Sequence, residues 1–211
     1  MNIQQWIVGE KRASCYLLRD ETTGRCALID PGVMTDALEK AIITAGVDCF
    51  DYILLTHCHY DHVGAAWQAQ QMTGAPIAIH ADDAAGLGVP LVNRTGAHGR
   101  TPVVFPSADL TLAEGKRLRV GSISLTVLHT PGHTAGGCCY LTEGRIFTGD
   151  TLFCGTCGKT DLPTGDAAQM RRSLGRLAAL EGDYVLLTGH GFNSTLARER
   201  QWILGRVDAT P

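Results

Sequence analysis

Four candidate metal ligands lie within six residues near the end of the first quarter of the chain, and this cluster constrains the fold more than any other stretch. They are His57, His59, Asp61 and His62, and they follow the apolar run 52–55, which is typical of a buried strand. Because side chains alternate along an extended backbone, His57 and His59 would project to the same side. The sequence therefore predicts a buried strand that leads directly into a group of ligands.

Three further candidate ligands follow, and each comes after an apolar run. They are His133, Asp150 and His190, and each has a neighbouring glycine, which allows the backbone to turn sharply. A single histidine of this kind is more often a core or surface residue, but three loops that repeat one pattern favour a shared site. Five histidines and two carboxylates suit zinc, iron or manganese, and seven ligands would fill two metal sites that share one of them.

Strand and helix patterns occur in both halves of the chain. In the first half we expect strands at 13–19, 25–29, 52–56 and 77–79, and helices at 35–45 and 61–73. In the second half we expect strands at 116–120, 122–128, 137–141, 145–148 and 184–188, and helices at 167–180 and 196–207. Residues 86–107 predict a long loop that could flank the site; no chemistry is assigned to it, and His98 in it is interpreted as a surface histidine rather than a ligand. The pattern indicates one α/β domain, 1–211, with two mixed sheets packed face to face and helices on the outer faces.

The composition argues against several classes of function. The 211 residues carry 18 basic and 21 acidic side chains, with a pI near 6.2, and this balance does not suit a nucleic-acid partner. The first residues do not form a signal peptide, and no apolar stretch has the length of a membrane span, so we expect a cytoplasmic protein without membrane contact. The eight cysteines should then be free thiols. Cys154 and Cys157 have the spacing of a redox pair or half a zinc site, but ordinary buried or loop cysteines are the better interpretation.

The ordered ligand set resembles the metallo-β-lactamase superfamily over essentially the whole chain. This resemblance implies the αββα sandwich of that superfamily and a dinuclear metal site. The first metal would be bound by His57, His59 and His133, the second by Asp61, His62 and His190, and Asp150 would bridge them. The cofactors implied are two divalent ions, zinc first, with iron or manganese also compatible.

Within that superfamily the chain is most similar to small glyoxalase II-like proteins, the hydroxyacylglutathione hydrolase group. The similarity lies in the segments 30–32, 56–57, 130–134, 147–153, 158–163 and 194–200. It implies a thioesterase that cleaves S-acylglutathione-like thioesters, small-molecule substrates that Lys159 would help to bind. A hydroxide bridging the two ions would attack the thioester, with His57, His59 and Asp61 as the catalytic residues. The chain departs from many relatives at Gly136-Gly137, where they have Gly-His, and at Gln201-Trp202.

Three other functions stay open at this point. A persulfide dioxygenase on the same scaffold would use one iron bound by His57, His133 and Asp150, and a β-lactamase or a non-catalytic metal-binding protein would also fit the fold. Asp30 has two interpretations of its own: it either orients a histidine ligand or caps the turn that contains it.

Overall fold

Two six-stranded sheets form the centre of the molecule, and the computed structural model describes residues 1–97 and 101–207 of the chain. The first sheet contains, in spatial order, β1 (Asn2–Val8), β2 (Ala13–Arg19), β3 (Cys26–Ile29), β4 (Phe50–Leu54), β5 (Ile77–His80) and β6 (Leu110–Leu112). Strands β1 to β3 are antiparallel, and β3 to β6 run parallel to one another. The sheet is therefore mixed, as the sequence predicts.

The second sheet is built from the second half of the chain. Its spatial order is β12 (Ser194–Thr195), β11 (Val185–Thr188), β10 (Arg145–Gly149), β9 (Cys138–Thr142), β8 (Ile123–His129) and β7 (Arg117–Val120). Only β10 and β11 pair in parallel; the remaining neighbours are antiparallel. This sheet is mixed as well.

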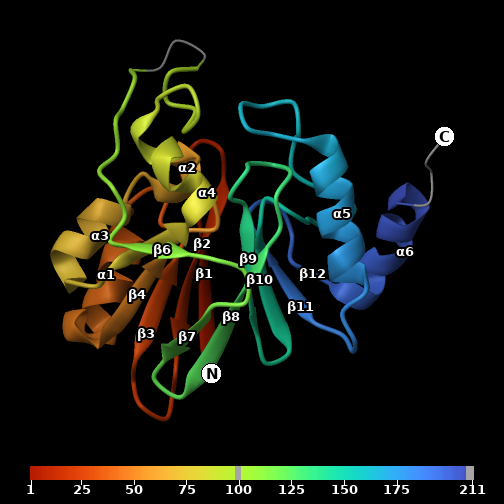
Figure 1. The fold of residues 1–211 in the computed structure, drawn as a ribbon. Helices are drawn as coiled ribbons and strands as arrows, with labels where there is room; N and C mark the ends of the chain where they lie inside the picture. Colours follow the sequence, from red (N-terminus) through yellow and green to blue (C-terminus); the bar gives the residue numbers. More distant parts are fainter. Residues whose placement is uncertain (98–100, 208–211) are drawn as a thin grey trace.

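Helices cover the outer faces of both sheets (Figure 1). Those of the first half are α1 (Asp36–Ala45), α2 (Tyr60–Val63), α3 (Ala66–Thr73) and α4 (Ala81–Ala84), with 3-10 turns η1 (Val47–Cys49) and η2 (Ala85–Gly88). Those of the second half are α5 (Ala167–Ala178) and α6 (Leu196–Val207). In Figure 1, α1 and α3 lie beside the first sheet, and α5 and α6 beside the second. Among the described residues no helix has the length and apolarity needed to cross a bilayer.

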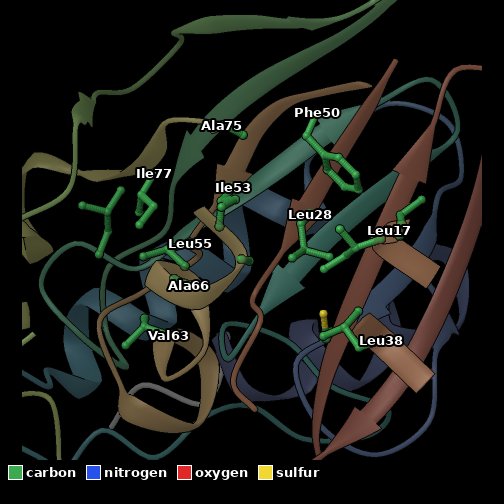
Figure 2. Packing of buried hydrophobic residues seen from close by; sticks show 14 of the residues in the cluster. Leu17, Leu28, Leu38, Phe50, Ile53, Leu55, Val63, Ala66, Ala75 and Ile77 are labelled. Atoms are coloured by element: carbon green, nitrogen blue, oxygen red, sulfur yellow. The ribbon is translucent and has the colours of Figure 1, made fainter. Parts of the chain in front are cut away.

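Three apolar layers hold these elements together. On the outer face of the first sheet, Leu17 and Leu28 pack against Leu38 of α1 (Figure 2). Between the sheets, side chains such as Ile29 and Tyr140 form a second cluster, and a third lies between the second sheet and α5 and α6. Three apolar layers separate four structural layers, so the predicted αββα sandwich is confirmed.

The structure differs from the sequence-based expectation in several places. The single helix expected at 61–73 is wrong: Ala65 donates its N–H to the carbonyl of Pro31, 2.8 Å away, and the helix is interrupted between α2 and α3. The approach is so close that a Cβ on Gly32 would lie 1.6 Å from the carbonyl oxygen of Asp61. Strands β1, β6 and β12 and helix α4 were not expected. His98 lies outside the described residues.

Candidate metal centre

The seven predicted ligands meet at one edge of the sandwich. His57, His59, Asp61 and His62 follow β4 of the first sheet, whereas His133, Asp150 and His190 follow β8, β10 and β11 of the second. The strands end at the same edge, so loops from both sheets approach one another there. The site therefore lies across the junction between the two sheets.

The first group consists of His57, His59 and His133, all buried. Their ring nitrogens lie within 4.8 Å of one another. The shortest separation, 2.9 Å, joins Nε2 of His133 to Nδ1 of His59. These three imidazoles form one potential metal site.

The second group consists of Asp61, His62 and His190, whose ligand atoms also lie within 4.8 Å of one another. The Nε2 atoms of His62 and His190 are 3.1 Å apart, and Oδ2 of Asp61 lies 3.5 Å from Nε2 of His190. Asp61 and His190 are partly exposed, so this group faces solvent more than the first does.

Asp150 contacts both groups through its two carboxylate oxygens. Oδ1 lies 3.4 Å from Nε2 of His62, and Oδ2 lies 3.3 Å from Nε2 of His133. A carboxylate in this position is suited to bridge two cations. The structure thus brings all seven predicted residues together with the grouping that the resemblance implies.

The polar atoms of the centre fit metal ions. Nε2 of His57 and Oδ1 of Asp150 are buried and have no hydrogen-bond partner among the residues the structure describes. A buried polar atom without a partner costs roughly 1–3 kcal/mol. Metal–nitrogen bonds of about 2.1 Å place neighbouring ligand atoms of a tetrahedral site roughly 3.4 Å apart. The separations of 3.1 and 3.5 Å in the second group lie close to this value, and the shortest separation in the first group, 2.9 Å, lies below it. Imidazole and carboxylate together suit a borderline divalent ion.

Hydrogen bonds behind the ligands orient the rings. Oδ2 of Asp30 lies 3.0 Å from Nδ1 of His62 and accepts the Thr56 hydroxyl at 2.6 Å, while Oδ1 accepts the Thr56 N–H at 2.7 Å. The same hydroxyl oxygen lies 3.1 Å from Nδ1 of His57. Because Nδ1 is engaged in both histidines, Nε2 faces the centre. Asp30 thus contacts His62 directly, which supports the interpretation that it orients a histidine. Through Thr56 the same hydrogen-bond network also reaches His57, so it connects the two ligand groups.

A backbone carbonyl orients His133 in the same way. The carbonyl oxygen of Lys159 lies 2.7 Å from Nδ1 of His133, so this ring also presents Nε2 to the centre. Lys159, the predicted substrate-binding residue, thus contacts the site through its backbone carbonyl.

Asp83, which lies in α4, was not identified from the sequence as part of the site. Its carboxylate accepts the N–H of Cys58 at 2.9 Å, the hydroxyl of Thr134 at 2.8 Å and the N–H of Gly136 at 2.7 Å. It thereby joins the loop that carries His57 and His59 to the loop that carries His133. In the sequence, Asp82-Asp83 is indistinguishable from a pair of surface acids.

The charge states of His57 and His59 suit metal binding, whereas that of His62 requires the loss of a proton. Burial, reinforced by the neighbouring imidazoles, holds the pKa values of His57 and His59 well below the ordinary value, so both rings are neutral. Burial acts to lower the pKa of His62 too, but the carboxylates of Asp150 and Asp30 outweigh it and raise the pKa to about 10. His62 therefore carries a proton that a bound cation would displace.

The centre opens into a cavity of about 500 Å³. Besides ligands, its walls include the aromatic residues Tyr60 and Phe153 and the cationic residues Lys11, Arg94 and Lys159. Phe153 packs edge-on against His190, with ring centroids 5.8 Å apart. Five of the seven candidate ligands thus line a pocket large enough for a small molecule.

Two other candidate clusters are less suited to metal. His80 and His129 stack face to face, 3.9 Å between centroids, beside Asp82, but Nε2 of His129 lies 2.9 Å from the Ala135 carbonyl, to which it donates. That hydrogen bond uses the nitrogen a metal would need. All eight cysteines are free, including Cys154 and Cys157, as expected.

Comparison with known proteins supports the geometry. The model of the Metallo-beta-lactamase superfamily matches residues 8–190. An uncharacterised protein of Aquifex aeolicus is 32% identical over 92% of this chain and 91% of its own length. A hydroxyacylglutathione hydrolase of Rhodospirillum rubrum is 35% identical over 84% of this chain, but the match spans 61% of that relative's length.

Solved structures show the same fold. BLEG-1, a B3 metallo-beta-lactamase, is 28% identical with a TM-score of 0.88, and 95% of this chain and 97% of that chain are covered. TTHA1623 in a di-iron-bound form is 33% identical with a TM-score of 0.80, covering 93% and 96%. ETHE1 from Myxococcus xanthus is 26% identical with a TM-score of 0.76, covering 99% and 91%. With a family model that matches most of its length, the chain belongs to the metallo-beta-lactamase superfamily.

Proposed function

We propose that this chain is a thioesterase of the glyoxalase II type that binds two divalent metal ions. His57, His59 and His133 would bind one ion, Asp61, His62 and His190 the other, and Asp150 would bridge them. The observation that carries the proposal is the contact of Asp150 with both ligand groups, 3.3 Å on one side and 3.4 Å on the other. The similarity to a hydroxyacylglutathione hydrolase supports the substrate class.

The reaction would be hydrolysis of the acyl–sulfur bond. Two divalent ions held by the seven candidate ligands would lower the pKa of a coordinated water and polarise the acyl carbonyl. The oxygen of water forms a new bond to the acyl carbon, the carbon–sulfur bond breaks, and the products are a carboxylate, a thiol and one released proton. No amino-acid nucleophile is needed.

Residues of the chain would position the reacting water and the substrate. Burial acts to raise the pKa of Asp61, but a hydrogen bond from His190 and the neighbouring imidazoles hold it well below its usual range. The charged Asp61 carboxylate lines the cavity. It would orient the attacking water by accepting a hydrogen bond from it. Lys159, at the cavity wall, would bind a carboxylate of the thiol carrier.

A second candidate function is a persulfide dioxygenase, and the fold similarity to ETHE1 is the observation that favours it. The di-iron-bound form of TTHA1623 shows that this fold binds iron, but as a pair of ions. In a persulfide dioxygenase one iron would be bound by His57, His133 and Asp150, and positions would stay open for oxygen. The completeness of the second ligand group argues for two ions instead. The similarity to BLEG-1 adds β-lactam hydrolysis to the activities to be tested.

Metal analysis combined with a substrate panel separates these functions. The enzyme is loaded separately with zinc, iron and manganese, and the metal content is measured per chain. Thiol release from S-lactoylglutathione, with two ions per chain, supports the thioesterase. Oxygen uptake with glutathione persulfide and one iron per chain supports the dioxygenase. If fully metallated enzyme releases no thiol from a series of acyl thioesters, the proposal is wrong.

The domain organisation, the size of the substrate and the cellular location are also part of the proposal. We infer one domain over 1–211, a small-molecule substrate and a cytoplasmic location in which the eight free cysteines stay reduced. Fractionation of cells that express the protein tests the location.

A further inference from the structure

We propose that Lys11 and Arg94, together with Lys159, form an anion-binding subsite for the thiol carrier of the substrate. The inference rests on the proposed thioesterase function and specifies its substrate class: thioesters whose carrier bears carboxylates away from the acyl–sulfur bond. The motifs that relate the chain to glyoxalase II include Lys159 but neither Lys11 nor Arg94.

The cavity has the opposite charge balance to the whole chain. The chain has a formal net charge of −3, yet three cationic side chains line the cavity beside two carboxylates, Asp61 and Asp150. Both carboxylates face the imidazoles of the metal centre. Divalent ions at that centre would add further positive charge. A positive cavity in an acidic protein attracts anionic ligands and repels cationic ones.

Hydrogen bonds of the neighbouring residues hold the backbone at Arg94 in one conformation. Arg94 has a left-handed conformation, with φ of 70°, which a residue other than glycine adopts only when its surroundings require it. Its neighbours are buried: the Asn93 side chain donates to the carbonyls of Leu87 at 2.8 Å and Val103 at 2.9 Å. On the other side of Arg94, Thr95 donates its N–H to the Asn93 side chain at 3.0 Å. These contacts fix the direction in which Arg94 leaves the loop.

The same loop is attached to the ligand segment. Tyr60 donates its N–H to the carbonyl of Asn93 at 2.9 Å, and this bond attaches the Arg94 loop to the segment that carries Asp61. Arg94 lines the cavity together with Tyr60 and Asp61, so it belongs to the wall next to this segment. Arg94 thus acts on the cavity next to the metal ligands.

Lys11 reaches the cavity from a different part of the fold. It lies in the turn between β1 and β2, where Arg12 donates its N–H to the Gly9 carbonyl at 3.1 Å. Directly after the turn, Ser14 donates its N–H to the Gly189 carbonyl at 2.8 Å, and this bond attaches the hairpin to the loop of His190. Lys11 and Lys159 are exposed at the rim, so they suit the part of a substrate that extends beyond the scissile bond.

A matched pair of substrates tests the subsite. S-acetylglutathione carries the carboxylates, and its dimethyl ester presents the same acyl–sulfur bond without them. In Arg94→Gln we expect KM for the acid to rise about three- to tenfold with kcat within twofold, as befits a partly screened ion pair, and KM for the ester to stay unchanged. Lys11→Gln should act in the same direction but more weakly. Lys116→Gln, an exposed lysine outside the cavity, is the control.

Two further measurements, the salt dependence of KM and the hydrolysis of a CoA thioester, test the subsite independently. Added salt should raise KM for the acid but not for the ester, because exposed charges are screened. Acetyl-CoA tests whether phosphates satisfy the subsite as well as carboxylates do; a CoA thioester preferred over the glutathione thioester overturns the assignment to carboxylates. Equal effects of Arg94→Gln and Lys11→Gln on acid and ester, or no effect on either, overturn the subsite itself.

A binding measurement separates this inference from the proposed activity. S-methylglutathione, which has no acyl group, is titrated calorimetrically into wild type, Arg94→Gln, Lys11→Gln and Lys116→Gln. If wild type hydrolyses no thioester but binds this thioether more tightly than the two cavity variants, the subsite is retained and the proposed function is not. If Arg94→Gln fails to fold, the test rests on Lys11→Gln. An affinity of Lys11→Gln for S-methylglutathione equal to that of wild type then refutes the subsite.

Discussion

Replacing Asp30 by asparagine should weaken metal binding at the His62 group far more than at the His59 group. Oδ2 of Asp30 faces two hydrogen-bond donors, the Thr56 hydroxyl at 2.6 Å and Nδ1 of His62 at 3.0 Å. In Asp30→Asn the side-chain NH2 group can take the place of Oδ2. Because NH2 is itself a donor, the Thr56 hydroxyl and Nδ1 of His62 would lose their acceptor. His62 then either loses the contact or moves its proton to Nε2, the atom that faces the metal.

The expected loss follows from these contacts. Removing the carboxylate partner of a ligating histidine typically costs 10- to 100-fold in metal affinity, or about 1.4–2.8 kcal/mol. The fold itself should be kept, because asparagine tolerates the left-handed backbone of residue 30, whose φ is 51°. His57 touches Asp30 only through Thr56, so the first group should change by less than the second.

Competition with a chromophoric zinc chelator gives the two dissociation constants, and nitrogen NMR of the His62 ring reports its tautomer independently of any activity. Asp109→Asn is the matched control, since Asp109 also accepts a backbone N–H, from Ile77 at 2.8 Å, but does not line the cavity. If folded Asp30→Asn binds both ions within threefold of wild type, the reasoning about the orientation of His62 is wrong.

Three shorter predictions concern other parts of the molecule. Asp150→Ala should reduce the metal content from two ions per chain to one or fewer, as measured by mass spectrometry of the desalted protein, because its carboxylate contacts both groups. Leu28→Ala, in the fully buried centre of β3, should lower the free energy of unfolding in urea by about 2–5 kcal/mol. Hydrogen bonds from Thr23 and from Ser122 hold the pKa of Asp20 well below its usual range. Asp20 therefore stabilises the fold above its unfolded-state pKa of about 3.9, so the difference in Tm between wild type and Asp20→Asn should be largest at neutral pH and shrink as the pH falls below about 4.

The ligand-bearing elements could be predicted because their sequences are locally unambiguous. The apolar runs before His57 and His190 are short, buried and followed by glycine or a polar turn, so strand and loop are both visible without tertiary information. Strand β1 could not be found in this way. Most of its side chains are exposed at the edge of a sheet, so it has no apolar pattern and depends on backbone pairing with β2.

The residues around the ligands were the least predictable part of the site. Asp83 contacts segments far away in the sequence, and Arg94 lines the cavity together with residues from other parts of the chain. Nothing near either residue in the sequence distinguishes it from a solvated charge. Asp30 was recognisable only as part of a turn, since its contact with His62 requires the two loops to be in place. Local patterns therefore reveal ligands at strand ends, whereas their supports appear only in three dimensions.

The position of the ligands across the junction of the two sheets has a consequence for folding. Each half of the chain supplies one sheet, and each of the two ligand groups takes side chains from both halves. A captured cation would thus act as a non-covalent cross-link between the N-terminal and C-terminal halves, and the unfolded chain, in which the halves are separated, cannot offer such a site. Thermal resistance of this protein should accordingly increase with the concentration of free metal.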